Sequence, residues 1–401
     1  MKNRDFIITS LQDWDVEIGS TIKNTAIEIS RNNRVLYINP PLDHATWIRR
    51  SKDESYIQRM DVVKGRRSYL RPVNNNMWIV DCPFMLFSIG KISNKWVFDF
   101  FNKWNNKKLA SFTLKVIKEL GFKSNIHLID NDIYRSLYLK ELLNPKVSVY
   151  YRRDYVVAFS YWKYHGLRLE PILCAKSDVV LANSLFFANE LRVYNSNIYD
   201  IETGVNLELY DSNINYKVPY DVENVKRPII GYVGAIYGSR LDIDLLYNLI
   251  EKRPELSYVF VGPEDETFIN HPIHQLSNVY FLGSKKVEEL PSYIASFDVC
   301  INPQVLNPIT IGNYPLKIDE YLAMGKPIVA TRTHTMEHIF KDYVHLADDI
   351  EGYSDLISKA LLEVSDEQMR ISRIQFAHTH SWENSVKKIY KAIEDFESSS
   401  C

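Results

Sequence analysis

Three charged residues lie close together where an α/β fold commonly binds ligands. Lys317, Asp319 and Glu320 follow Pro315 in the run PLKIDEYLAMGKPIVAT. Because the first turn of a helix tolerates proline, and a glycine such as Gly325 ends a helix, these charges fall near the N-terminus of a short predicted helix. A helix N-terminus favours a negatively charged group. The pattern therefore favours a binding site for an anionic ligand.

Two buried strands are predicted on either side of this helix. Residues 297–302 (FDVCIN) and 326–331 (KPIVAT) are short apolar runs bounded by helix and turn signals. In open α/β sheets, ligands bind beyond the carboxyl ends of parallel strands, which is where the predicted helix begins. The alternative interpretation is an ordinary βαβ connection whose charges are solvated.

The run from Pro315 to Thr331 resembles the nucleotide-sugar-binding segment of GT-B-fold glycosyltransferases of the large retaining family 4. In that family, a glutamate in the position of Glu320 holds the ribose hydroxyls of the donor. A branch that resembles teichuronic-acid and capsule transferases shows the pattern P-L-K-x-x-E-Y-L-A-x-G-K-P, which this chain reproduces and which assigns Lys317 to the donor phosphates. Family members usually carry a second glutamate eight positions before the first, and here that residue is Gly312.

The resemblance implies an α/β fold of the GT-B type. That fold has two Rossmann-like, doubly wound domains that face each other across a cleft, and a C-terminal helix that crosses back to the first domain. We expect residues 1–215, with the terminal helix 381–397, to form the acceptor-side domain and residues 216–380 to bind the nucleotide sugar. Strand and helix signals alternate in both halves, as such a fold requires. The polar, proline-flanked residues 218–228 mark the expected boundary.

The same resemblance assigns further residues to the donor. In the family, the loop after the first strand and the turn after the first strand of the second domain face the donor diphosphate, which points to Gly19 and Gly234. Ala235 stands where an arginine is usual, so Arg240 is the expected substitute. Thr310, in the loop before the predicted helix, completes the expected donor site. For Gly19, a glycine needed only for the turn is the alternative interpretation.

A loop of the first domain supplies the catalytic candidates. After the predicted strand at 147–151 the chain reads RRDYVVAFSYWKYHG, which brings Arg153, Asp154, Tyr164 and His165 to the edge of the sheet. Related transferases often carry acids near the reacting sugars in this segment, and only Asp154 matches them. We therefore expect Asp154 and Arg153 to act in catalysis. A surface ion pair between Asp154 and a neighbouring arginine is the alternative.

Charge is unevenly distributed along the 401 residues. The net charge is −2, but residues 1–120 hold 20 Lys and Arg against 12 Asp and Glu, a balance of +8. Within residues 91–118, seven lysines alternate with aromatic residues and a single acid, Asp99. Such a segment can lie in a membrane interface, with lysines on the headgroups and rings in the acyl boundary. A packed helix with one solvated face is the alternative.

Several classes of protein and site are disfavoured. No run approaches the roughly 18 apolar residues of a membrane span, the N-terminus lacks the apolar core of a secretory signal, and the four cysteines have no CxxC spacing. These features predict a cytoplasmic protein, which the basic segment would hold at the inner face of the membrane. No nucleic-acid-binding module is recognisable, so we expect no nucleic acid partner.

Metal sites are also disfavoured. The acidic pairs at 130–132 and 242–244 have DxD spacing, but the second opens a predicted helix and the first precedes one. The histidine pairs 271/274, 334/338 and 378/380 lack a supporting set of acids or cysteines, so we expect surface histidines and no metal.

The sequence therefore predicts a glycosyltransferase that moves a hexose from a UDP- or GDP-sugar to a glycan or lipid-linked acceptor in surface polysaccharide synthesis. Retention of configuration and independence of metal or cofactor follow from the resemblance. The alternative, favoured by Gly312 and Ala235, is a non-catalytic GT-B-like protein that binds a nucleotide or a partner. The donor base, the sugar and the linkage are left open.

Overall fold

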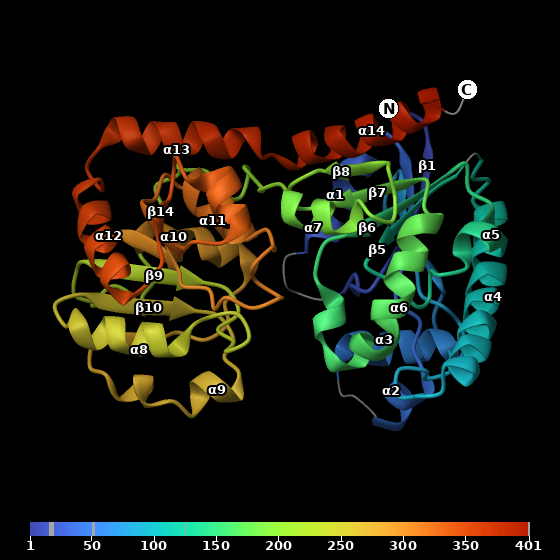
Figure 1. The fold of residues 1–401 in the computed structure, drawn as a ribbon, viewed down its shortest axis with the longest axis horizontal. Coiled ribbons are helices and arrows are strands. Elements are labelled where there is room, and N and C mark those ends of the chain that lie inside the picture. Colours follow the sequence, from blue (N-terminus) through green and yellow to red (C-terminus); the bar gives the residue numbers. More distant parts are fainter. Residues whose placement is uncertain (16–19, 50–52, 124, 400–401) are drawn as a thin grey trace. The chain divides into compact units, whose positions relative to one another are not determined.

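Each half of the chain folds around its own β-sheet with helices on both faces (Figure 1). The computed structural model describes residues 1–15, 20–49, 53–123 and 125–399. The chain divides into two compact units, the first formed by residues 1–201 and 385–401 and the second by residues 202–384. None of the described helices combines the length and the apolar composition that crossing a membrane requires.

The first unit alternates strands and helices almost throughout. Its described elements are β1 (Asp5–Ser10), α1 (Thr21–Ser30), β2 (Arg34–Ile38), α2 (His44–Arg49), α3 (Glu54–Val63), β3 (Leu70–Asn74), β4 (Met77–Val80), α4 (Lys95–Glu119), β5 (Ile126–Asp130), α5 (Leu139–Leu143), β6 (Val147–Arg152), the 3₁₀ turn η1 (Val156–Ala158), α6 (Ser160–Lys176), β7 (Val179–Ala182), α7 (Leu185–Leu191), β8 (Ile198–Asp200) and most of α14 (Trp382–Ser399).

The strands of the first unit lie in the order β3-β4-β2-β1-β5-β6-β7-β8. Every neighbouring pair is parallel except β3 with β4. The order reverses between β1 and β5, so the loops after these two strands diverge at the carboxyl edge of the sheet. Such a reversal is where doubly wound sheets bind ligands.

Successive residues of β1 face two different cores, as a buried central strand requires. Phe6 and Ile8 pack in a cluster with α1 and with residues of α14 such as Ile389. Ile7 packs on the opposite face, with Leu109 of α4. The predicted return of the terminal helix to the first domain is therefore confirmed.

The second unit is an all-parallel α/β unit. Its described elements are β9 (Ile229–Val233), α8 (Ile243–Lys252), β10 (Ser257–Val261), α9 (Glu266–Ile269), the 3₁₀ turns η2 (Pro272–Gln275) and η3 (Val287–Glu289), β11 (Val279–Phe281), α10 (Leu290–Ser296), β12 (Val299–Asn302), α11 (Leu316–Ala323), β13 (Ile328–Thr331), the π-helical turn η4 (Met336–Phe340), β14 (His345–Ala347), α12 (Ile350–Leu362) and α13 (Glu367–Thr379).

The strands of the second unit lie in the order β11-β10-β9-β12-β13-β14, so its order reverses between β9 and β12. Ile229 and Val233 of β9 face a core that includes α10 and α11. Ile230 and Tyr232 face the opposite core, with α8 and α12. The predicted α/β class with two doubly wound units is confirmed.

The unit boundary differs from the expected one. The sequence placed residues 202–215 with the first domain, whereas the structure assigns them to the second unit. Val205 and Tyr210 are buried in the second unit's core, beside Tyr314. Apolar packing, rather than the polar composition of residues 218–228, sets this boundary.

Local features of the first unit depart from a simple alternation of strands and helices. Residues 70–74 form β3, which pairs antiparallel with β4. The helix predicted after the acidic pair at 130–132 is only the five residues of α5. The loop expected after β6 is short, because α6 begins at Ser160 and carries both Tyr164 and His165.

Candidate functional site

Helix α11 holds the charged residues singled out in the sequence. It begins after Pro315, whose extended backbone precedes the first helical residue, and lies at the carboxyl side of the β9/β12 reversal. Gly325 ends it with φ at +70°. The amide of Gly325 donates to Leu322 and that of Lys326 to Tyr321, which is the paired closure of a Schellman motif. The predicted helix end is therefore confirmed.

Lys317 lies against the turn that follows β9. Its ammonium is 4.9 Å from the ring centroid of Tyr232, in cation–π contact. A Cβ on Gly234 would lie 3.0 Å from Cε and 3.3 Å from Nζ of Lys317. Gly234 has φ of +137°, and a Cβ on Gly262 would lie 1.9 Å from the Gly234 carbonyl oxygen. The structure thus brings together two of the predicted donor-binding residues, Lys317 and Gly234, at a turn that admits no side chain.

Glu320 sits one turn further along α11 and is partly buried. Burial raises the pKa of its carboxyl to about 7, and the charge of Lys317 and a hydrogen bond with Tyr210 oppose this rise. Burial and the same carboxylate raise the pKa of Tyr210 well above its ordinary value. Tyr210 is 4% exposed and was not singled out from the sequence, where it lies far from Glu320. A carboxyl group whose pKa lies near neutral pH is typical of functional sites.

Asp319 points away from Glu320 into the interior. It accepts hydrogen bonds from the Tyr314 hydroxyl at 2.6 Å and from Nδ1 of His380 at 3.0 Å. The other ring nitrogen of His380 lies 3.4 Å from the Glu202 carboxylate. The expectation that His380 is a surface histidine is therefore wrong, because its side chain is buried between two acids.

The loop between β12 and α11 contains Thr310. This residue is fully buried, and its hydroxyl donates to the carbonyl of Val305 within the same loop. The amide of Asn307 donates to that hydroxyl at 3.2 Å. These hydrogen bonds stabilise the conformation of the loop. Contact of Thr310 with a donor stays a prediction.

Arg240 follows the β9 turn and is partly exposed. Its backbone carbonyl accepts from the amide of Val305 at 3.0 Å, which joins the two loops at the β9/β12 reversal. Among the described residues, its guanidinium makes no ion pair. Asn302, at the end of β12, is fully buried, and its side-chain amide has no hydrogen-bond partner within the described part of the chain. Asn302 is a further polar group at this reversal that sequence reasoning did not identify.

Arg153 and Asp154 lie at the carboxyl edge of the first unit's sheet. Arg153 forms ion pairs with Asp130 at 3.1 Å and with Asp154 at 2.8 Å. Asp130 is fully buried and accepts from the hydroxyl of Ser10 at 2.7 Å. These carboxylates raise the pKa of Arg153 above its ordinary value, against the effect of burial. The ion pair considered as an alternative role for Asp154 is present, and a catalytic role stays a prediction.

The remaining candidates are Gly19, predicted to bind the donor, and the two DxD patterns, considered as metal sites. Gly19 lies outside the described residues. Asp242, the first acid of one DxD pattern, caps α8 by accepting from the amide of Leu245 at 2.9 Å. In the other pattern, Asp132 pairs with Arg135 at 3.1 Å. One acid of the first pattern thus caps a helix, and an acid of the second is held in an ion pair.

Comparison with known sequences agrees with the geometry of the second unit. Residues 227–363 match the family model described as Glycosyl transferases group 1. Over 201 residues the chain is 27% identical to TuaH of Bacillus subtilis (strain 168), a glycosyltransferase assigned to teichuronic acid biosynthesis. This alignment covers 48% of the present chain and 50% of TuaH, so the match spans about half the length of the relative.

Comparison with solved structures covers nearly the whole chain. Sucrose-phosphate synthase from Thermosynechococcus elongatus has a TM-score of 0.68 at 14% identity, over 99% of this chain and 100% of that one. HepE of Anabaena, solved with UDP and glucose, has a TM-score of 0.64 at 13% identity, over 98% and 100% of the two chains. Identities this low show the fold alone. The chain therefore has the GT-B fold over its length, and residues 227–363 of its second unit are similar to the group 1 glycosyltransferases.

Proposed function

We propose that this protein transfers a hexose from a nucleoside diphosphate sugar, with UDP or GDP as the nucleotide, to a glycan or lipid-linked acceptor in surface polysaccharide synthesis. The observation that carries the proposal is the contact of Lys317 with the Gly234 turn at the β9/β12 reversal. Retention of configuration and independence of metal are part of the proposal.

The phosphate end of the donor would lie at this contact. When the glycosidic bond breaks, negative charge grows on the diphosphate, and fixed positive groups lower the barrier most where they need no rearrangement. Lys317 supplies a full charge, and the N-terminus of α11 supplies oriented amide dipoles. Among the described residues, the amide of Ala235 makes no hydrogen bond, so it is free to donate to a phosphate oxygen. Arg240 is the remaining cation of this set.

The nucleoside would be held by Glu320. A carboxylate accepts two hydroxyl hydrogen bonds at once, which suits the vicinal hydroxyls of ribose. The hydrogen bond with Tyr210 fixes one side of this carboxylate. The second unit therefore offers groups for both ends of a nucleoside diphosphate.

The acceptor side is proposed from the surface of α4. Trp96, Phe100 and Trp104 recur every four residues and are 74%, 62% and 54% exposed, so they form one outward-facing stripe, here called the aromatic stripe. If α4 were only a packed helix with a solvated face, these three rings would be expected in the core, and they are not. The buried face of α4 instead carries polar side chains, among them Asn102 and Asn106. These amides lie beside apolar residues of the same buried face, such as Phe98 and Leu109. A row of exposed apolar rings rimmed by polar residues is typical of a docking face.

The partner that fits this face is an anionic membrane surface. Lys103, Lys107 and Lys108 are exposed on the same helix. The acid of this segment, Asp99, is paired with Arg168 at 2.8 Å. Lysines beside exposed rings match anionic headgroups above an acyl boundary, at about 1 kcal/mol for each basic residue. We therefore propose a peripheral protein of the cytoplasmic membrane face that acts on a membrane-borne acceptor.

Turnover of a donor panel tests the enzymatic proposal. Purified protein is incubated with UDP- and GDP-sugars, with and without EDTA, and release of the nucleoside diphosphate is measured. Release or transfer that survives EDTA supports the proposal. Saturable nucleotide binding without turnover across donor and acceptor panels would instead support a non-catalytic binding protein, the role that Gly312 and Ala235 favour.

A further inference from the structure

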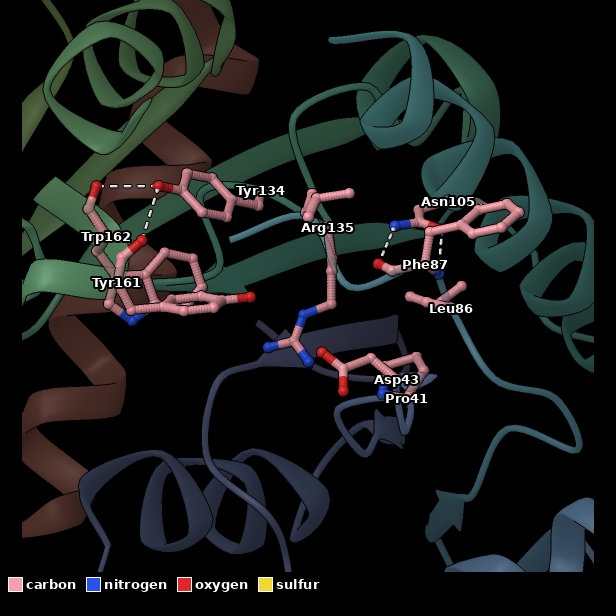
Figure 2. Close-up of a pocket in the computed structure, with 10 residues that line it drawn as sticks. Pro41, Asp43, Leu86, Phe87, Asn105, Tyr134, Arg135, Tyr161 and Trp162 are labelled. Atoms are coloured by element: carbon pink, nitrogen blue, oxygen red, sulfur yellow. Dashed lines mark hydrogen bonds between the residues drawn. The ribbon is translucent and has the colours of Figure 1, made fainter. Parts of the chain in front are cut away.

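A pocket of about 140 Å³ lies at the carboxyl edge of the first unit's sheet, outside the sites described above. Figure 2 shows its walls, which come from the loops after β2, β4 and β5, from Asn105 of α4 and from the start of α6. Four aromatic side chains and two opposite charges line most of it, namely Phe87, Tyr134, Tyr161, Trp162, Asp43 and Arg135. A cavity of roughly 150 Å³ accommodates one six-membered ring.

Two hydrogen-bonding groups of the pocket are unused. Nε of Arg135 donates to Asp132 at 3.1 Å, but its two Nη atoms make no hydrogen bond among the described residues. The hydroxyl of Tyr161 points into the pocket in Figure 2 and likewise has no hydrogen-bond partner in the described part of the chain. The carboxylate of Asp43 faces the Arg135 guanidinium, and one of its oxygens accepts from Thr46 at 2.7 Å. Donors and an acceptor are therefore presented together to a ligand.

The walls are held by bonds that do not involve these groups. The side-chain amide of Asn105 donates to and accepts from the backbone of Phe87, both at 2.9 Å. The hydroxyl of Tyr134 donates to the carbonyl of Trp162 at 2.9 Å. Both contacts are drawn as dashed lines in Figure 2. The pocket is therefore built before any ligand arrives.

A glycine positions the ring of Tyr161. A Cβ on Gly90 would lie 1.9 Å from that ring, so only glycine lets the ring lie where it does. Tyr161 is nevertheless 43% exposed, which is unusual for a ring seated so closely on backbone. One face of the ring is therefore fixed by the protein while the rest of the side chain is open to a ligand.

These features match a carbohydrate ring. Aromatic faces pack against the C–H face of a pyranose. The hydroxyls of a pyranose can accept hydrogen bonds from the Arg135 guanidinium and donate hydrogen bonds to the Asp43 carboxylate. Among the described residues that line the pocket, Arg135 supplies the one guanidinium, and it is balanced by Asp43 and by the buried Asp132, so this lining has no excess positive charge for an anionic sugar. We infer that this pocket binds one uncharged hexopyranose unit of the acceptor glycan. The assignment to the acceptor, although not the sugar binding itself, rests on the proposed function.

Saturation-transfer NMR tests the sugar binding directly. The probes are methyl β-D-glucopyranoside, its N-acetylglucosamine counterpart and methyl β-D-glucuronide, each titrated into the full chain. We expect saturation of the ring protons of the two uncharged glycosides, with dissociation constants on the order of 1 mM. The glucuronide is expected to bind more weakly. Stronger binding of the glucuronide, or binding of nucleosides in place of the hexosides, would overturn the inference.

Matched variants locate the binding in the pocket. Tyr161→Ala is expected to weaken hexoside binding by about tenfold or more, and Tyr161→Phe by less, because the ring is kept and only the hydroxyl is lost. Tyr164→Ala, one turn along α6 and 65% exposed, is the control and should bind as the wild type does. Equal binding by wild type and Tyr161→Ala would sink the assignment.

Gly90→Ala gives a second, independent variant. Its methyl group displaces the ring of Tyr161 without touching any pocket charge, so it should reproduce the Tyr161→Ala loss with a small change in Tm. Donor hydrolysis without acceptor should be unchanged in both variants, while KM for the acceptor rises. If the wild type binds hexosides but turns over no donor, the proposed function fails and the sugar pocket is still supported.

Discussion

Asp319 and His380 are joined by a buried hydrogen bond of 3.0 Å. It connects helix α11, which carries Lys317 and Glu320, to the turn that precedes α14. The same turn is tied to the segment after Glu202, because the amide of Val205 donates to the His380 carbonyl at 2.8 Å. The position of α11 thus depends on contacts with both ends of the second unit.

Replacing His380 by Ala should destabilise the protein by about 3 to 5 kcal/mol, because it leaves the buried carboxylate of Asp319 with only Tyr314 as a partner. Burial already raises the pKa of Asp319, and loss of the imidazole raises it further. Between the ordinary pKa of an aspartic acid and this raised pKa, the native variant holds a proton that its unfolded chain has released. The free energy of unfolding of the variant should therefore fall further below that of the wild type as pH rises through this range. Urea unfolding at pH 5 and pH 8 measures this. The exposed His378→Ala is the control, and His380→Asn, which keeps a donor, should restore part of the loss.

Replacing Glu320 by Gln should weaken donor use by roughly 10- to 150-fold, the equivalent of about 1.5 to 3 kcal/mol for a charge-assisted pair. Since the pKa of Glu320 is about 7, donor binding by the wild type should strengthen as pH rises through 7. The variant should lack this dependence. Donor KM measured from pH 6 to 8.5 checks both statements, and an unchanged KM and kcat would refute the assignment.

The titration of Glu320 should affect the stability of the protein in the opposite direction: donor binding should strengthen as pH rises, whereas the free energy of unfolding should fall. Its pKa is raised from the ordinary value of 4.5 to about 7, so the native state retains a proton that the unfolded chain has lost between these values. The free energy of unfolding therefore falls as pH rises through this window, and Glu320→Gln should remove that part of the fall. Thermal unfolding across the window measures the difference, with the exposed Glu288→Gln as control.

Replacing Lys317 by Ala should lower kcat/KM for the donor by about tenfold or more, since a charge that meets the leaving diphosphate is lost. Gly234→Ala should have a similar effect, because its Cβ would press on Cε of Lys317 and its φ of +137° disfavours any side chain. Initial rates with varied donor test both variants. Lys341→Ala, an exposed lysine of the same unit, should behave as wild type.

Asp154→Asn should lower kcat far more than Tm if its loop faces the reacting sugars, because a transition-state contact is lost while the fold is kept. Arg153→Ala should instead lower Tm, since it leaves the fully buried Asp130 without its cation. A large fall in Tm for Asp154→Asn with normal specific activity would assign Asp154 a structural role.

Sedimentation with vesicles tests the aromatic stripe. Binding should require anionic lipid, fall as salt rises, and weaken in the triple change of Lys103, Lys107 and Lys108 to Gln. Changing Trp96, Phe100 and Trp104 to Ser in addition should abolish the vesicle binding that remains. Three exposed lysines of the second unit changed to Gln, at 226, 341 and 359, control for net charge. A wild type that stays in the supernatant at low salt would exclude the membrane proposal.

The elements that could be predicted from sequence are those set by local pattern. The strands around α11 are short, β-branched and fully buried, and Gly325 adopts the left-handed conformation that its position implied. The contacts that could not be predicted join distant segments. His380 and Asp319 are 61 residues apart, and no local signal links them. Tyr210 meets Glu320 only because the fold buries the segment after Val205.

Helix α4 shows why composition alone left its role open. Periodicity arguments place Trp and Phe inside and Asn outside, because burying apolar surface is favourable. Here the stripe residues are exposed, while Asn106 is buried and bonds to the Tyr134 carbonyl at 2.9 Å and, through its oxygen, to the amide of Tyr138 at 3.0 Å. The cost of burying this amide is met by partners that only the folded structure supplies.

The discontinuous first unit also sets an order of events during synthesis. Its strands β1 to β8 leave the ribosome first, but the apolar face that Val386, Ile389 and Ile393 of α14 will cover cannot close until residues 202–384 have been made. At roughly 5 to 20 residues per second, this interval is about ten to forty seconds. The second unit is continuous in sequence and can complete its core in that time. The half of the protein that is synthesised first is therefore the half that finishes folding last.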